Sequence, residues 1–251
     1  MRTAKRKRLL LVGLNADLVE SRQGRFVVLA DEYCAAIAAT GAIPILLPTQ
    51  DSSGLDEILP LLTGLVLIGG DDLDCRPDAS QPHEYGYLLH NQRETFDRRL
   101  IEIAQHQKMP VLAIGTGMQE LNVCCGGSLF RHLPADVPAA PLHYDHMQVL
   151  KHKICVRENT WLAGVQSYDC SVVSSHHMAV SAVAPTFRVS AVCPAGIIEA
   201  IECVRSWFAI GVQFHPEHKA ANEFGKRIFE AFVCRAAHTR AARSWKNVTT
   251  C

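Results

Sequence analysis

The first place in the sequence where chemistry is expected is a strand, turn and helix around Gly115. Val111–Ile114 is a short apolar run typical of a buried strand, and residues 116–125 continue with helical spacing. A residue at such an elbow projects from the carboxyl end of a sheet. It also lies at a helix N-terminus, where backbone N–H groups stabilise a thiolate or an oxyanion. Gly115 has no side chain, so this elbow carries no nucleophile of its own.

A second candidate is the pair His215 and Glu217, which follows the apolar run 208–212. A histidine oriented by a carboxylate is the base half of a triad made of a nucleophile, a histidine and an acid. On its own a His-x-Glu pair is weak evidence, because such pairs also arise by chance on protein surfaces. Its meaning depends on what the fold places beside it.

A third candidate is the glycine pair Gly69-Gly70, which ends the apolar run 64–68. Glycines directly after a buried strand let backbone N–H groups approach a ligand closely, and this suits an oxyanion hole. The alternative interpretation is an ordinary turn. These two glycines therefore gain weight only from their order along the chain with Gly115 and His215.

The elements that must position these residues follow from hydrophobic periodicity. The N-terminal half alternates strands with helices, and this order predicts parallel crossovers with helices on both faces of the sheet. Beyond residue 151 the runs are short and strand-like, so antiparallel additions to the sheet are expected. We interpret residues 1–251 as one domain, with a polar surface loop at 74–89. The predicted strands are 9–14, 43–47, 64–68, 111–114, 153–157, 171–174, 188–193, 197–203 and 208–212, and the predicted helices are 29–40, 95–107, 116–125 and 223–237.

Composition limits the classes of partner. The chain has 251 residues, of which 48% are apolar and 20% charged, so a large core can be buried. Lys plus Arg and Asp plus Glu each number 25, and this balance argues against a nucleic-acid or membrane partner. No apolar run reaches the roughly 20 residues that span a membrane, and the short apolar run near the N-terminus reads as a first strand rather than a signal peptide.

The ten cysteines form no CxxC pair, and most are scattered through apolar runs. That pattern favours free core thiols over a disulfide framework or a metal site. We therefore predict a reduced, cytoplasmic protein with no cofactor and no metal.

The three candidates, taken in this order, resemble the class I glutamine amidotransferase-like superfamily. Within it the chain is similar to the peptidase C26 group, typified by γ-glutamyl-γ-aminobutyrate hydrolase of putrescine degradation. The resemblance implies an α/β three-layer sandwich of the flavodoxin-like type, with a mostly parallel central sheet. It covers most of the chain and rests on Glu32-Tyr33, Gly69-Gly70-Asp71, Arg93-Glu94, Gly117-Met118-Gln119, Ser175-His176, Glu199-Ala200 and Gln213-Phe214-His215-Pro216-Glu217.

The resemblance also implies a role for each site residue. In the family a cysteine thiolate attacks a γ-glutamyl amide carbon, and this cysteine would stand at Gly115. His215 would act as base and then acid, and Glu217 would orient its imidazole. The oxyanion would be bound by the N–H of Thr116 and by one from Gly69-Gly70. Gln119 and His176 would contact the substrate. The family reads Ile-Cys-Arg-Gly-Met-Gln where this chain reads Ile-Gly-Thr-Gly-Met-Gln, so both the nucleophile and its neighbour differ.

Three functions remain open from the sequence. The first is a γ-glutamyl or glutamine-like ligand site that has lost covalent amide hydrolysis through natural divergence at Gly115. The second is an active hydrolase, with a cysteine changed to Gly115 by engineering or with a substitute such as Thr116, Cys124, Cys125 or a water activated by His215. The third is a non-catalytic assembly or regulatory protein. Family members commonly associate, so a homodimer is possible in each case.

Overall fold

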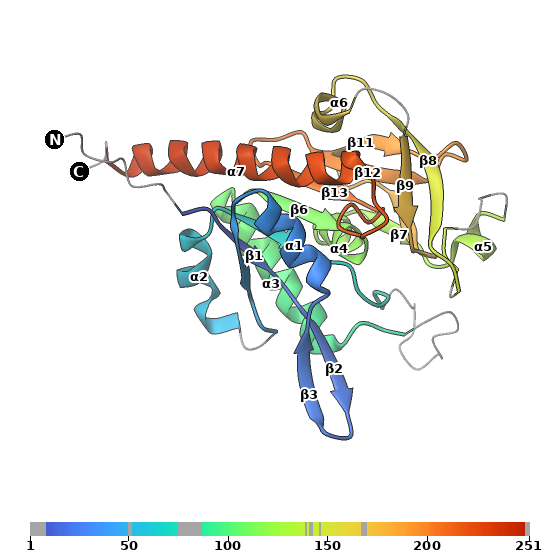
Figure 1. Cartoon of the computed structure of the whole chain (residues 1–251), viewed down its shortest axis with the longest axis horizontal. Coiled ribbons are helices and arrows are strands. Elements are labelled where there is room, and N and C mark those ends of the chain that lie inside the picture. Colours follow the sequence, from blue (N-terminus) through green and yellow to red (C-terminus); the bar gives the residue numbers. More distant parts are fainter. Residues whose placement is uncertain are drawn as a thin grey trace.

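A mixed nine-stranded sheet forms the centre of the computed structural model (Figure 1). The structure describes residues 9–49, 52–74, 87–138, 140, 143–145, 147–166 and 170–248, and the side chains of α7 as far as residue 239. In the described residues the strand order of this sheet is β4-β1-β5-β6-β13-β12-β11-β8-β9. Two small two-stranded sheets, β2-β3 and β7-β10, stand beside it.

The elements have the following bounds. The strands are β1 Leu11–Leu14, β2 Asp17–Ser21, β3 Gly24–Val28, β4 Ile43–Leu46, β5 Gly64–Leu67, β6 Val111–Ile114, β7 Ser128–Phe130, β8 Leu150–Val156, β9 Cys170–Ser174, β10 Ala179–Ala182, β11 Phe187–Val192, β12 Ile198–Cys203 and β13 Ala209–Val212. The helices are α1 Asp31–Ala39, α2 Leu55–Ile58, α3 Asn91–Gln107, α4 Thr116–Cys124, α5 Leu133–Asp136, α6 Trp161–Val165 and α7 Glu223–Val248, with single turns η1 Ser52–Gly54 and η2 Leu59–Leu61.

The sheet changes character at β13. β4, β1, β5, β6 and β13 pair in parallel, whereas β12, β11, β8 and β9 are added antiparallel. The prediction of an α/β fold with antiparallel additions in the C-terminal half is therefore confirmed. Since β5, β6 and β13 are adjacent and parallel, their carboxyl ends meet at one edge of the sheet, where ligands of open α/β sheets bind.

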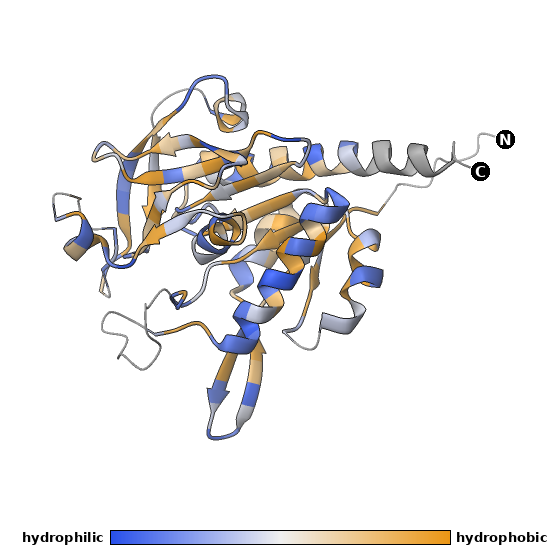
Figure 2. Ribbon diagram, turned by 180° about the vertical axis from the view of Figure 1, so that it is seen from behind, coloured by the Kyte–Doolittle hydropathy of each residue, from blue (hydrophilic) through white to orange (hydrophobic). Residues whose placement is uncertain are grey.

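Helices cover both faces of this sheet, as predicted. On one face α1 and α7 bury Ile37 and Phe229 against strand residues such as Val66. On the other face α3 and α4 bury Leu100 and Met118 against their own set of strand residues. Figure 2 shows hydrophobic residues concentrated along the central strands, and hydrophilic residues along the outer side of α3. The three layers follow from the apolar runs of the parallel strands, which need cover on two sides.

Two local differences from the sequence prediction have identifiable causes. Helix α3 begins at Asn91 rather than residue 95, because His90 caps it: its imidazole Nδ1 accepts a hydrogen bond from the Gln92 N–H at 3.2 Å. Helix α7 runs beyond residue 237 to Val248, through a stretch that contains no Gly or Pro to end it. Most of the predicted 74–89 loop lies outside the described residues.

The hairpin β2-β3 was not predicted. It projects from the body of the molecule (Figure 1), and its side chains after Leu18 are exposed, including Val19 and Phe26. An amphipathic pattern cannot reveal strands whose apolar residues face solvent. None of the eight cysteines within the described residues takes part in a disulfide. Within the same residues no helix is long and apolar enough to cross a membrane.

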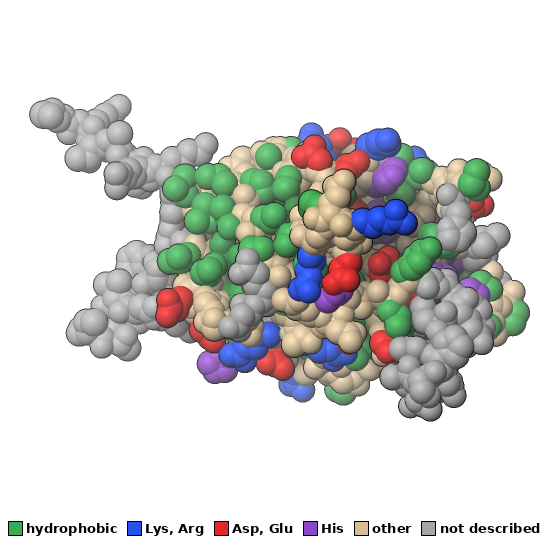
Figure 3. Space-filling view, turned by 90° about the horizontal axis from the view of Figure 1, so that it is seen from below, with side chains coloured by type: hydrophobic (Ala, Val, Ile, Leu, Met, Phe, Trp, Pro, Cys, Tyr) green, Lys and Arg blue, Asp and Glu red, His purple; other side chains and the backbone are tan. Residues whose placement is uncertain are grey.

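Apolar side chains are also exposed along the β4 edge of the sheet. Ile43 and Leu46 of β4 are 41% and 45% exposed, and Ile58 of α2 and Leu61 of η2 are 42% and 59% exposed. Figure 3 shows hydrophobic side chains gathered on the part of this face toward α2. An edge strand with exposed apolar residues is open to association with another chain.

Candidate active site

Three strand ends bring the predicted site residues together. In the parallel ladder Ile114 of β6 pairs with Val212 of β13, and the N–H of Gly115 donates to the Val212 carbonyl at 2.9 Å. His215 lies just beyond β13, where its N–H donates to the Val173 carbonyl of β9 at 2.9 Å. Gly69 follows β5 on the other side of β6. Neighbouring parallel strands therefore place the elbow, the imidazole and the glycine pair side by side.

Gly115 has the backbone conformation of a strained elbow, with φ 57° and ψ −120°. L-residues rarely adopt a positive φ, so glycine relieves strain at this position. A Cβ placed on Gly115 would lie 3.4 Å from His215 Cε1, 3.5 Å from Gly69 Cα and 3.7 Å from His215 Nε2. All three are ordinary van der Waals separations, so a small side chain fits here and would face the imidazole.

The His215 imidazole is held by Glu217. Nδ1 lies 2.7 Å from Glu217 Oε1, so Nδ1–H donates to the carboxylate and Nε2 is the atom that faces Gly115. Burial lowers the His215 pKa, but the charge and hydrogen bond of Glu217 raise it more, and the net pKa is raised above its ordinary value. The predicted base and its orienting acid therefore form the pair that a triad requires.

The two residues of the glycine pair make different contacts. The N–H of Gly69 donates to the Tyr33 hydroxyl at 3.1 Å, so it is engaged inside the protein. Burial, together with the charge of Glu217, raises the Tyr33 pKa well above its ordinary value, so Tyr33 stays a neutral phenol. Of the two predicted oxyanion glycines, Gly70 is thus the one whose N–H remains a candidate. The Gly70 carbonyl in turn accepts the Thr116 hydroxyl at 2.8 Å, and this fixes the loop against the start of α4.

Gln119 lies on the first turn of α4 with its amide almost fully buried. Its Nε2 donates to the Met178 carbonyl at 3.3 Å and to Gln213 Oε1 at 3.2 Å. The same Met178 carbonyl lies 2.9 Å from His176 Nδ1. Gln119 and His176 thus share one anchor in the segment after β9, which forms a wall of the site.

These residues line a cavity of about 340 Å³. Its size is in the range of small-molecule sites, and its mixture of backbone, acidic and imidazole groups suits a polar ligand. Two of its residues, Asp72 and His177, were not singled out from the sequence; His177 Nε2 lies 2.9 Å from Asp72 Oδ1. The available signal in the sequence for His177 was its position directly after Ser175-His176. The lining residues are Gly69, Gly70, Asp71, Asp72, Tyr87, Gly115, Thr116, Gln119, Tyr144, Ser175, His176, His177, Met178, Gln213 and His215.

The side chains considered as substitute nucleophiles are engaged elsewhere. Burial raises the pKa of the Cys124 thiol to about 12 and that of the Cys125 thiol to about 11, so both are protonated at neutral pH. Neither thiol lines the cavity. The Thr116 hydroxyl donates a hydrogen bond to the Gly70 carbonyl.

The Peptidase C26 family model matches residues 11–217, which include the elbow, the glycine pair and the His-x-Glu segment. This chain belongs to the Peptidase C26 family. It is 33% identical over 229 residues to the γ-glutamyl-γ-aminobutyrate hydrolase of Escherichia coli O157:H7, across 84% of this chain and 87% of that one. The Shigella flexneri protein of the same name is 32% identical with the same coverage. Among solved structures, a glutamine amidotransferase of Thermotoga maritima has a TM-score of 0.59 at 14% identity, covering 93% of this chain and 91% of that one. This last likeness concerns the fold alone.

Proposed function

We propose that this Peptidase C26 protein binds a γ-glutamyl or glutamine-like ligand and lacks covalent amide hydrolysis, because Gly115 stands at the nucleophile position. The observation that carries the proposal is the cavity at the strand ends. It combines an oriented His215, a helix N-terminus and the Gly70 loop around an elbow that has no side chain. Family membership and the names of the relatives support the ligand class.

The groups of the cavity match those of a γ-glutamyl compound. Asp71 and Asp72 offer carboxylates to the ligand's α-ammonium group, and the N–H groups of Gly70 and Thr116 offer donors to its amide carbonyl. The carbonyl would then lie beside Gly115, with His215 Nε2 on its other side. In a cysteine enzyme of this type the thiolate would occupy that gap.

Loss of the thiol removes the covalent pathway. Removal of the nucleophile from a hydrolytic triad lowers the rate by on the order of 10⁶, and a residual ~10³-fold acceleration remains from binding and the oxyanion hole. The imidazole and its carboxylate would then serve to hold the ligand. We infer a binding protein that keeps the arrangement of a hydrolase.

Calorimetry with γ-glutamyl-γ-aminobutyrate tests the proposal directly. The intact protein should bind it, and Asp72→Asn should weaken binding. The control variant His106→Ala, at an exposed residue of α3 outside the cavity, should leave binding unchanged. γ-Aminobutyrate alone, which lacks the glutamyl group, should not bind. Absence of heat from every γ-glutamyl compound and from glutamine at ~1 mM, a weak-binding limit near −4 kcal/mol, would reject the ligand site.

A second candidate function is slow hydrolysis by water, and the space beside His215 favours it. A Cβ position on Gly115 lies 3.7 Å from Nε2, so the gap left by the missing side chain faces the base. Such a water lacks the entropic advantage of a fixed nucleophile. Release of γ-aminobutyrate that disappears in His215→Ala would establish this function. A cysteine codon at position 115 in the source gene would instead identify an engineered change in an active hydrolase.

Assembly is a separate expectation. The exposed residues of the β4 edge are a candidate dimer surface, and light scattering of the purified protein decides between monomer and dimer. A dimer that survives Leu46→Glu would place the interface elsewhere. The single domain over residues 1–251 and the reducing cytoplasmic location remain our interpretations of the sequence.

A further inference from the structure

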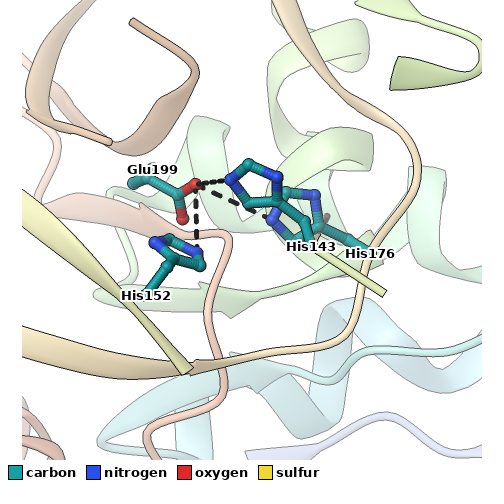
Figure 4. Close-up of side chains that lie close together, drawn as sticks. All are labelled: His143, His152, His176 and Glu199. Carbon is teal, nitrogen blue, oxygen red and sulfur yellow. Dashed lines mark ion pairs between the residues drawn. The ribbon is translucent and has the colours of Figure 1, made fainter. Parts of the chain in front are cut away.

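A second group of chemically active side chains lies behind the wall of the cavity. Three imidazoles and one carboxylate converge from separate segments: His143 from the stretch before β8, His152 from β8, His176 from the turn after β9 and Glu199 from β12. Figure 4 shows the three rings directed toward one carboxylate oxygen. Glu199 Oε1 lies 3.4 Å from His143 Nε2, 3.5 Å from His152 Nε2 and 3.7 Å from His176 Nε2.

The group is shielded from solvent, and four of its polar atoms, on Glu199, His152 and His176, have no hydrogen-bond partner among the described residues. The side chains of His143 and Glu199 are 0% exposed, that of His176 is 4% and that of His152 is 11% exposed. Among the described residues, neither Glu199 oxygen has a hydrogen-bond partner, nor does Nε2 of His152 or of His176. Buried polar atoms of this kind are costly unless another group satisfies them.

The other ring nitrogens determine which atoms face Glu199. His176 Nδ1 lies 2.9 Å from the Met178 carbonyl, and His152 Nδ1 lies 3.1 Å from the Lys153 carbonyl. A carbonyl only accepts, so each Nδ1 carries the proton and each neutral ring directs the lone pair of Nε2 at the carboxylate. Lone pairs and a negative charge repel one another. Either extra protons or a cation must lie between them.

A cation satisfies these atoms with both Nδ1 protons left in place, because the Nε2 lone pairs and the carboxylate oxygen can all act as metal ligands. Neutral imidazole and ionised carboxylate are the protonation states that bind metals. The carbonyl contacts at Nδ1 are the usual outer contacts of a metal-bound histidine.

The spacing is close to that of a tetrahedral site. Zn²⁺ binds imidazole nitrogen and carboxylate oxygen at about 2.0–2.2 Å, and a tetrahedron of that radius has ligand atoms about 3.3–3.6 Å apart. Two of the three distances from Glu199 Oε1, 3.4 and 3.5 Å, match this edge, and the third, 3.7 Å, is slightly longer. The whole set lies within 4.8 Å, so the widest pair would close by roughly 1.3 Å through side-chain rotation.

We propose that His143, His152, His176 and Glu199 bind one divalent transition-metal ion of the zinc type in a closed structural site. Four protein ligands leave no open position for substrate, which is the pattern of structural rather than catalytic zinc. Imidazole-rich sets select such ions over Mg²⁺ and Ca²⁺, which prefer oxygen ligands. The sequence prediction of no metal is thereby replaced by a specific proposal.

The site would act on the cavity through His176. The metal would hold this ring, its Nδ1–H donates to the Met178 carbonyl, and Gln119 donates to the same carbonyl. Binding the metal therefore links β8 and β12 to the cavity wall. This metal site does not depend on the proposed γ-glutamyl ligand, because its ligands are complete without one.

Elemental analysis of the full chain, purified without a histidine tag, tests the proposal. We expect about one zinc-type ion per chain in the wild type and in His106→Ala, whose imidazole is exposed on α3. His152→Ala and Glu199→Gln should lose it. Co²⁺ added to the stripped protein should give the intense visible absorption of a tetrahedral site.

A second measurement keeps the test valid if those variants do not fold. Stripping the wild type with a strong chelator should lower its Tm, and Zn²⁺ at 100 times its Kd should restore it by about 5–10 °C, while Mg²⁺ should not. Wild-type protein without bound metal, with a Tm that does not respond to Zn²⁺ or Co²⁺, would overturn the proposal. The cluster would then be a protonated His–Glu assembly. Calorimetry with γ-glutamyl-γ-aminobutyrate on the stripped and reloaded forms separates this failure from a failure of the ligand proposal.

Discussion

Gly115→Cys is the perturbation that most directly examines the proposed function. The backbone there has φ 57° and ψ −120°, and a non-glycine residue held in such a region costs about 1–3 kcal/mol. The nearest atoms to a new Cβ are 3.4 and 3.5 Å away, so no clash adds to this strain. With about 2 kcal/mol lost, and about 2–4 °C for each kcal/mol in a protein of this size, the Tm should fall by about 4–8 °C.

The catalytic consequence follows from the position of His215. The new Cβ lies 3.7 Å from Nε2, so the thiol attached to it can reach the imidazole and transfer its proton. Since loss of a triad nucleophile costs on the order of 10⁶ in rate, restoring it should raise γ-aminobutyrate release by at least ~10³ if the remaining site is intact. Gly115→Ala is the matched control, because it introduces the same Cβ and the same strain without a thiol.

The assay is release of γ-aminobutyrate from its γ-glutamyl conjugate, measured for wild type, Gly115→Ala and Gly115→Cys. A parallel readout is labelling of the new thiol by iodoacetamide at pH 6, located by peptide mapping, because pairing with His215 favours the thiolate. The reasoning is refuted if Gly115→Cys is folded and binds the substrate yet releases no more product than Gly115→Ala. It is equally refuted if the wild type already matches Gly115→Cys, since another group would then supply the chemistry.

Three further predictions concern the supports of the site. Glu217→Gln should lower the His215 pKa, which NMR titration measures. The raised pKa of the wild type contributes stability that is fully present below pH ~6.5 and is lost as the pH rises through the folded-state pKa. The variant should therefore lose more stability at pH 6 than at pH 9. An equal loss at both pH values would contradict this. Tyr33→Phe leaves the buried Gly69 N–H without its acceptor and should cost about 1–3 kcal/mol in urea unfolding at an unchanged m-value. Asn122→Ala removes one side chain that bonds three backbone groups around β7 and β10, and should cost about 3 kcal/mol; a loss under ~1 kcal/mol would mean that water replaces these bonds.

Several parts of the fold could be predicted because their causes are local. The runs at β5, β6 and β13 are uniformly apolar, and this pattern is typical of strands buried on both faces. Helices between them require parallel crossovers. The exposed hairpin β2-β3 and the short helices α2, α5 and α6 could not be predicted, because their stability comes from neighbours rather than from a periodic face of their own.

Within the candidate active site, only relations between residues of the same motif could be predicted from the sequence. The spacing of His215 and Glu217 is two residues, and the hydrogen bond between them is correspondingly local. The engagement of the Gly69 N–H inside the protein was not predictable. It depends on Tyr33, which reaches Gly69 across 36 positions of the sequence.

The sequence by itself determined the family, the order of the motifs that follow the parallel strands, and the absence of a side chain at Gly115. Each of these is a property of a continuous stretch of residues. The tertiary structure alone decided that His143, His152, His176 and Glu199 meet. Their ligand atoms lie within 4.8 Å although the residues come from four separate segments. No spacing rule reaches across such intervals, because the antiparallel pairing of β8, β9, β11 and β12 creates this proximity only once the sheet has formed.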